Sequence, residues 1–197
     1  ARAGLTVPED RKNSEYAQRK TRIYEINRLA ANFFYKNLLK GTDKRGLQYF
    51  AQRKLSPQTV KKYGLGFAPD SYNTLYNHLK ENGYKDDEII DSWLCSRSEK
   101  NGKIYDIFRN RVMFPIIDLR GNVIGFGGRV LDDSKPKYLN TSKTPVFDKG
   151  NNLFSMNFAK NSPEKRIILA EGYMDVISIN QAGFENVVAT LGTAITA

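Results

Sequence analysis

The alternation of apolar and polar positions divides the chain into a helical first half and a strand-rich second half. From Asn13 onward, apolar residues recur at intervals of three and four, as on one face of an α-helix, and Gly41 ends the run. Shorter helical patterns follow. Residues 111–118 and 123–131 then carry dense apolar runs, which predict two antiparallel strands joined by a turn. Because proline donates no backbone hydrogen bond, Pro115 predicts an edge position or a bulge in the first of these strands.

The end of the chain predicts one strand–helix–strand unit. After Arg166, residues 167–170 form a short apolar run typical of a buried strand in a parallel sheet. Tyr173 to Gln181 has helical spacing with Gly183 as its stop signal, and residues 187–190 predict the next strand. The expected fold class is therefore α+β, in which a helical and antiparallel-strand subdomain precedes the first βαβ unit of an α/β fold.

Two carboxylates follow the first strand of this unit. Glu171 lies at its carboxyl end, where open α/β sheets place their ligands. Asp175 follows four residues later, one helical turn away on the same side. Two carboxylates facing one crevice suit a magnesium ion, which takes few protein oxygens and keeps several waters. The alternative is that Glu171 only caps the helix, where a negative charge is favoured in any protein.

Charge and composition narrow the class of partner. The net charge is +10, from 31 Lys and Arg against 21 Asp and Glu, which favours an anionic polymer or nucleotide, although a solvated basic surface gives the same count. Cys95 and His78 are the only residues of their types, which excludes a disulfide framework and argues against a zinc site in this chain. No apolar run approaches the roughly 20 residues that cross a bilayer, so we expect no membrane partner.

Two arginines precede or begin the first predicted strand of the pair. Arg109 and Arg111 are two residues apart, so a strand would place them on one face, about 7 Å from each other. This distance is close to the spacing of successive phosphates along a single strand of nucleic acid. The alternative is that both arginines face solvent on an edge strand and discourage aggregation.

Further cations follow among aromatic residues. Arg129 closes a glycine-rich segment, which either lets a phosphate approach or marks a bulge. Lys137 and Tyr138 set a cation beside a ring that could stack a base, and Lys149 lies on a predicted loop. This combination is typical of a nucleic-acid groove, although aromatic residues in strands more often belong to the core.

An ordered set of short motifs resembles the catalytic core of the DnaG-type bacterial replicative primases. The segment Glu171-Gly172-Tyr173-Met174-Asp175-Val176 is similar to the TOPRIM module that topoisomerases and these primases share. The other matching stretches are Leu65–Pro69, Phe108–Ile116, Val123–Val130, Pro136–Asn140 and Phe147–Gly150. No single stretch is decisive, but the ordered set is specific and covers most of the chain.

The resemblance implies roles for the matching residues. Glu171 would be the catalytic TOPRIM glutamate and, together with Asp175, a ligand of Mg²⁺ or Mn²⁺ in the complete TOPRIM domain. Arg53 is a weaker match, because Lys54 stands where the family usually has glycine. The residues implied to line the groove for template, product and nucleotide are Arg53, Arg109, Arg111, Arg129, Lys137, Tyr138 and Lys149.

The same resemblance implies a domain organisation. We expect a linker over residues 1–12, the N-terminal subdomain of a primase core over 13–163, and the beginning of a truncated TOPRIM domain over 164–197. The family has later Asp-x-Asp acids, whereas Glu185 is the only acid after Asp175. We therefore expect a fragment that holds magnesium poorly and has little or no activity alone. Zinc is expected only in a separate N-terminal domain that this chain lacks.

The implied activity is DNA-templated synthesis of short RNA primers from ribonucleoside triphosphates, as by a DNA-directed RNA polymerase during replication. The implied partners are a single-stranded DNA template, the RNA primer, the triphosphates and the replicative helicase of the primosome, which a missing C-terminal domain would bind. The implied location is the cytoplasmic replication fork. Two alternatives stay open, namely a nucleic-acid-binding module without chemistry and another TOPRIM enzyme such as a topoisomerase or nuclease.

Overall fold

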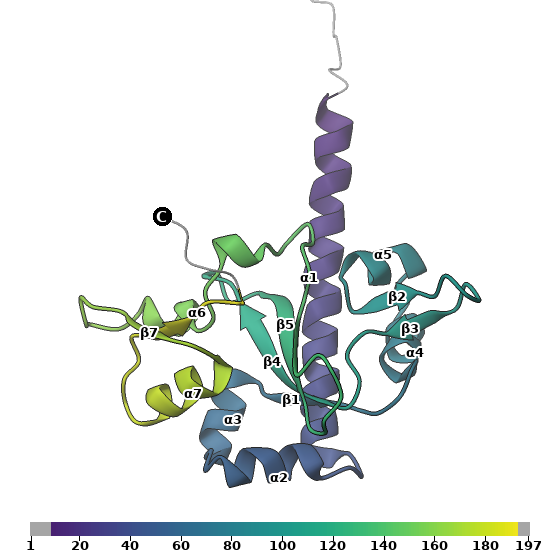
Figure 1. The fold of residues 1–197 in the computed structure, drawn as a ribbon. Helices are drawn as coiled ribbons and strands as arrows, with labels where there is room; N and C mark the ends of the chain where they lie inside the picture. Colours follow the sequence, from purple (N-terminus) through teal and green to yellow (C-terminus); the bar gives the residue numbers. More distant parts are fainter. Residues whose placement is uncertain (1–8, 193–197) are drawn as a thin grey trace, which may run out of the picture.

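The computed structural model describes residues 9–192, and their side chains from Asn13 onward. A four-stranded antiparallel sheet in the order β1-β4-β5-β6 forms the centre, and the long helix α1 runs along it (Figure 1). The hairpin of β2 and β3 with helices α4 and α5 lies on one side of α1, and the unit of β7, α7 and β8 lies on the other (Figure 1). The expected α+β class, with an antiparallel half and an α/β start, is confirmed.

The elements in chain order are α1 (Glu9–Lys40), α2 (Arg45–Gln52), α3 (Pro57–Tyr63), β1 (Gly66–Ala68), α4 (Thr74–Glu81), α5 (Asp86–Asp91), β2 (Cys95–Arg97), β3 (Ile104–Asp106), β4 (Arg111–Ile117), β5 (Val123–Val130), β6 (Tyr138–Asn140), the 3₁₀-helix η1 (Lys149–Asn151), α6 (Met156–Ala159), β7 (Ile168–Ala170), α7 (Tyr173–Gln181) and β8 (Val187–Ala189).

Helix α1 supplies much of the buried apolar surface of the N-terminal half. Of the apolar positions that the spacing predicts, Ile23, Ile26, Ala30, Phe34 and Leu38 are almost fully buried. Phe33 is half-buried, and Tyr16 is 51% exposed. The helix begins before the predicted start, so residues 9–12 of the expected linker are helical, while residues 1–8 lie outside the described part. Helix α1 has 32 residues but is polar, and no helix between residues 9 and 192 is both long and apolar enough to cross a bilayer.

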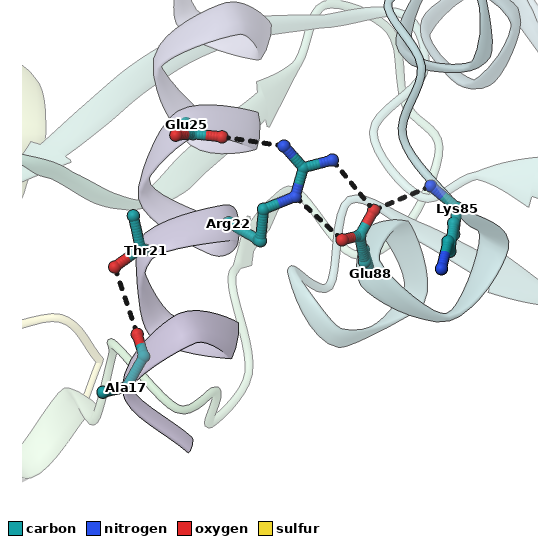
Figure 2. A network of polar contacts seen from close by, with 6 residues as sticks. All are labelled: Ala17, Thr21, Arg22, Glu25, Lys85 and Glu88. Carbon is teal, nitrogen blue, oxygen red and sulfur yellow. Dashed lines mark hydrogen bonds and ion pairs between the residues drawn. The ribbon is translucent and has the colours of Figure 1, made fainter. Parts of the chain in front are cut away.

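The N-terminal half of α1 is also tied to α5 by charged groups (Figure 2). Arg22 donates to both carboxylate oxygens of Glu88, at 2.8 and 3.3 Å, and to Glu25 at 3.0 Å. Glu88 in turn accepts from the backbone N–H of Lys85, the N-cap residue directly before α5 (Figure 2). The hydrogen bond from Arg22 is the main reason why the pKa of Glu88 lies below its usual value. Because these side chains are partly exposed, the contribution to stability is modest.

Pro115 is accommodated because β4 is an inner strand for only part of its length. Strand β1 pairs with β4 from Arg111 to Met113 and ends before Pro115, whose one ladder partner within residues 9–192 is Phe126 in β5. The register also shifts between Ile116 and Ile117. The prediction of an edge position or a bulge is thus confirmed, since β4 has a free edge at the proline and an irregularity directly after it.

The predicted βαβ unit is confirmed, with α7 at the expected bounds and β7 parallel to β8. One expectation for it is wrong, because β7 is not a buried strand. Leu169 is 53% exposed and Ile167 is 48% exposed. Ile168 and Ala170 pack against the core on one face of β7, while Leu169 points to the opposite face, which is exposed. The apolar run correctly indicated a strand but could not indicate what covers it.

Tyr173, the first residue of α7, joins this unit to the central sheet. Its ring stacks on Phe114 of β4 with centroids 4.9 Å apart, and Phe154 meets it edge-on at 4.7 Å. Its hydroxyl donates to Asn140 of β6 at 2.8 Å. The ring lies directly over Gly127 of β5, where an added Cβ would be 2.4 Å from ring carbon Cζ. The unit of β7, α7 and β8 therefore contacts the central sheet through Tyr173, and this contact requires a residue without a side chain at position 127.

This contact predicts the effect of a methyl group at position 127. Gly127→Ala should lower the free energy of unfolding by about 1–3 kcal/mol, the usual cost of overpacking, because the tyrosine ring must move. Urea denaturation measures the loss. Gly150→Ala is the control, because a Cβ there would meet nothing closer than 3.5 Å. A Gly127→Ala protein as stable as the parent would contradict this packing.

Candidate nucleic-acid interface

Two of the expected groove arginines share one aromatic ring. Arg53 directly follows α2, and Arg129 lies near the end of β5. Their guanidinium carbons lie 5.4 and 4.7 Å from the ring centroid of Tyr49, a residue of α2. These three residues, with Arg45 and three others, line a hollow of about 360 Å³. The structure thus brings together cations that are far apart in the sequence.

Tyr49 itself is buried, and its hydroxyl has no hydrogen-bond partner among the described residues. Burial raises its pKa, while Arg129 and Arg53 act in the opposite direction. The ring therefore holds two arginines by cation–π attraction, which leaves the positive charge uncancelled. The sequence analysis missed Tyr49, although Arg45, Tyr49 and Arg53 are spaced by four, as on one face of a helix.

Lys54, which stands where the family usually has glycine, has the backbone conformation that glycine favours. Lys54 has a φ of 57°, in the left-handed region that glycine adopts without cost. The turn after Arg53 therefore has the shape that a glycine would favour, although lysine occupies it. Lys54 carbonyl oxygen accepts from Gln181 of α7 at 2.9 Å, which anchors the turn. The departure in residue type thus leaves Arg53 in place.

The hollow continues beyond Arg129 along the loop after β5. A second hollow of about 310 Å³ is lined by Arg129, Lys137 and the residues from Val130 to Lys135. Tyr138 of β6 is the direct partner of Arg129 in the sheet register, and it is 43% exposed. Arg53, Arg129, Lys137 and Tyr138 therefore lie along one continuous surface, which we call the basic groove.

The structure places Arg111 inside the fold and not on the open strand face that its spacing from Arg109 suggested. Arg111 is 6% exposed, and its guanidinium donates to the carbonyl oxygens of Gly128, Pro136 and Lys137 at 3.3, 2.9 and 3.4 Å. Burial lowers its pKa. Arg111 thus holds the loop between β5 and β6 from inside, and it supports the basic groove without facing it.

Arg109 does not share a strand face with Arg111 either. Strand β4 begins at Arg111, and Asn110 before it has a φ of 51°, which turns the chain. The Arg109 side chain points toward the hairpin of β2 and β3 and lies 4.5 Å from the ring centroid of Tyr72. The two-residue spacing therefore failed as a guide, because it assumed an extended backbone at position 110.

Lys149 stands at the start of η1, beside Asp148, which accepts from Gly150 N–H at 3.0 Å and pairs with Lys143 at 2.9 Å. Between residues 9 and 192, no hydrogen bond or ion pair fixes the Lys149 side chain. The structure thus places Lys149 on a loop, as predicted, but it shows no contact that links this residue to the basic groove.

The acidic corner at the end of β7 is open to solvent. Glu171 and Asp175 are both exposed, and Asp175 turns back toward Gly172, with Oδ2 3.5 Å from the position of an added Cβ there. Two exposed carboxylates on one turn fit a magnesium ion that also keeps waters and binds phosphate. Among the described residues, no third His, Cys, Asp or Glu joins these two carboxylates to form a group of three possible metal ligands.

Tyr173 connects the acidic corner to the strand that carries Tyr138 of the basic groove. This tyrosine comes two residues after Glu171, and its hydroxyl bonds to Asn140, two residues after Tyr138 in β6. The rings of Tyr138 and Tyr173 have centroids 6.5 Å apart. Asn140 also donates to the Leu191 carbonyl oxygen at 2.9 Å, beyond the end of β8. Cations, an exposed ring and two carboxylates thus converge at one edge of the sheet.

Known proteins share this architecture. A family model described as the DNA primase catalytic core, N-terminal domain, matches residues 33–160, and a Toprim domain model matches residues 165–197. The chain is 47% identical to a DNA primase of Clostridium acetobutylicum and covers 33% of that protein. It is 41% identical to one of Deinococcus radiodurans, again covering 33%. These matches take in 99% and 100% of the chain, which therefore spans about a third of these relatives.

A solved structure of a DnaG primase catalytic domain bound to single-stranded DNA superposes with a TM-score of 0.85 at 36% identity. The match covers 91% of this chain and 58% of that one. The resemblance drawn from the motifs is confirmed by these relatives and by the two family models. Since the first model matches well over half of the residues, the chain belongs to the family of the DNA primase catalytic core, and a Toprim segment follows that domain.

Proposed function

We propose that this chain is the part of a DNA primase that binds template and nucleotide next to the acidic corner of the Toprim segment. The observation that carries the proposal is the basic groove. In it, Arg53 and Arg129 stack on Tyr49, and the surface extends from Arg129 to Lys137 and Tyr138. The relative that superposes on this fold binds single-stranded DNA, which supports the same partner here.

The groove can act on nucleic acid in two ways. Arginine and lysine neutralise backbone phosphates without reading the sequence, which suits an enzyme that copies any template. The exposed ring of Tyr138 offers a face on which a base can stack. Together they would hold template and ribonucleoside triphosphate in fixed positions, and positioning is the main contribution of a protein to phosphoryl transfer.

The reaction that we propose joins ribonucleotides into a short RNA primer. The 3′-hydroxyl of one nucleotide attacks the α-phosphate of the next, and pyrophosphate leaves. Glu171 and Asp175 would hold Mg²⁺ or Mn²⁺, which stabilises charge on the reacting oxygens when bound. The cations of the basic groove, which lies beside this corner, would balance the charge of the phosphates that they hold.

The wider setting is also part of the proposal. The RNA primer, the triphosphates and the replicative helicase of the primosome would be the partners, and the cytoplasmic replication fork would be the location. The relatives named as DNA primases support this setting. A topoisomerase is disfavoured, because Tyr173, the tyrosine next to the glutamate, is buried and bonded to Asn140 and is not free to act as a nucleophile.

The basic groove makes a prediction for salt dependence. Arg129→Gln should weaken binding of single-stranded DNA, and the slope of log affinity against log salt should fall by about 0.7, the value for one phosphate contact on a single strand. Fluorescence anisotropy over a series of salt concentrations measures both. Arg120→Gln is the matched control, since Arg120 is exposed in the turn between β4 and β5. If the two variants lowered the affinity equally, binding would depend on the net surface charge and not on the basic groove, which would contradict the proposal.

The acidic corner makes a second prediction. The 197-residue chain should bind single-stranded DNA and synthesise no detectable primer, because its described corner offers only two carboxylates. Glu171→Gln should leave that binding unchanged. In a longer polypeptide with a complete Toprim domain, the same change should lower primer synthesis by about two orders of magnitude or more. Incorporation of labelled ribonucleotides measures synthesis, and primers made by the 197 residues alone would refute the first expectation.

A further inference from the structure

Gln181, the last residue of α7, joins this helix to the turn that follows α2. Its Nε2 donates to the carbonyl oxygen of Lys54 at 2.9 Å, and its Oε1 accepts from the backbone N–H of Ser56 at 2.8 Å. Both polar ends of the side-chain amide are therefore used on one turn. Helix α7 lies against α3, the helix that begins directly after this turn (Figure 1).

The turn needs such support, because one of its residues is strained. Lys54 has a φ of 57°, a left-handed conformation that a residue with a side chain keeps only when its surroundings hold it there. Local bonds hold one side of the turn, since the N–H groups of Lys54 and Leu55 donate back to carbonyl oxygens of α2 at 2.8 and 3.1 Å. Gln181 binds the Lys54 carbonyl oxygen and the Ser56 N–H, which these local bonds do not use.

Arg53 depends on this turn more than the rest of α2 does. It is exposed and directly precedes the strained residue. Tyr49, whose ring centroid lies 5.4 Å from the Arg53 guanidinium carbon, is buried in the core. Packing therefore holds the body of α2, whereas the turn and the ring hold Arg53. A loosened turn would let Arg53 leave the ring while Tyr49 and Arg129 stay in place.

The helix that ends at Gln181 also carries Asp175 of the acidic corner. Tyr173 fixes its first turn on the central sheet, and Gln181 fixes its last residue on the turn after α2. A helix of nine residues spans about 12 Å between its first and last Cα atoms. Helix α7 thus works as a short rigid spacer between the acidic corner and the turn that carries a cation of the basic groove.

We propose that Gln181 is a positioning residue for the basic groove, because it holds the turn after α2 and thereby keeps Arg53 on the ring of Tyr49. This role rests on the proposed function, since the position of Arg53 matters only if Arg53 binds a phosphate. Gln181 acts through the turn and does not itself face the ligand. The Toprim segment therefore shapes the basic groove in addition to providing the acidic corner.

The first test is Gln181→Leu, which removes both hydrogen bonds and keeps the net charge at an exposed site. In the 197-residue chain, it should weaken binding of oligo(dT) by about threefold or more, as expected for residues that act as one unit. The slope of log affinity against log salt should also fall, because a displaced Arg53 no longer neutralises a phosphate. Fluorescence anisotropy over a series of salt concentrations measures both quantities.

A double-mutant cycle separates positioning from a loss of folding stability. Arg53→Gln alone should weaken binding of oligo(dT). Adding Gln181→Leu to Arg53→Gln should weaken it no further, because the side chain that Gln181 positions is already gone. A purely structural role of Gln181 would instead lower the affinity by the same factor in both backgrounds.

Asn180→Ala is the matched control. Asn180 is the neighbour of Gln181 in α7, and its Oδ1 accepts from Lys62 of α3 at 2.9 Å. This change therefore also removes a polar contact of α7 and leaves the net charge unchanged, but it does not touch the turn that carries Arg53. The affinity and the salt slope of Asn180→Ala should equal those of the parent chain.

Three results would each overturn the role of Gln181. They are parental binding by Gln181→Leu, an equal loss in Asn180→Ala, and an undiminished further loss when Gln181→Leu is added to Arg53→Gln. Arg53→Gln distinguishes these results from failure of the proposed function. If Arg53→Gln weakens binding and Gln181→Leu does not, the basic groove stands and the positioning role falls. If Arg53→Gln has no effect, the place of Arg53 in the groove fails first, and the role of Gln181 fails with it.

Discussion

The arrangement of the site depends on the packing of the Tyr173 ring against Gly127. The ring fills the space that a side chain on β5 would need, stacks on Phe114 and bonds to Asn140. The start of α7 is thereby fixed against the middle of the central sheet. Because Glu171 is only two residues earlier, the same contact sets the acidic corner beside the strands that carry the basic groove.

Aromatic rings, rather than carboxylates, hold the arginines that we assign to nucleic acid. Arg53 and Arg129 lie on Tyr49, and Arg109 lies on Tyr72. Cation–π contact orients a guanidinium without cancelling its charge, so the charge stays available for a phosphate. The arginine that ties the helices together behaves differently, since Arg22 is paired with Glu88. The kind of partner thus separates arginines that can bind an anion from those that stabilise the fold.

Local patterns predicted the elements well and their surroundings less well. The bounds of α7, the parallel strands around it and the irregularity near Pro115 follow from periodicity, stop signals and the missing N–H of proline. The burial of β7 did not follow, because it depends on what packs over the strand. Arg109 and Arg111 show the same limit, since a left-handed Asn110 between them breaks the assumed alternation.

By itself, the sequence determined the order and type of the elements, the excess of positive charge and the motifs that identify the family. These are properties of short segments or of the whole composition, and they do not require knowing which segments meet. Only the tertiary structure decided which cations face a ligand. Three carbonyl groups from the far end of β5 and the loop beyond it turn Arg111 inward, while a ring on α2 draws Arg53 and Arg129 together. The surroundings of each charge come from residues distant in the chain, so its role is settled only when the chain folds.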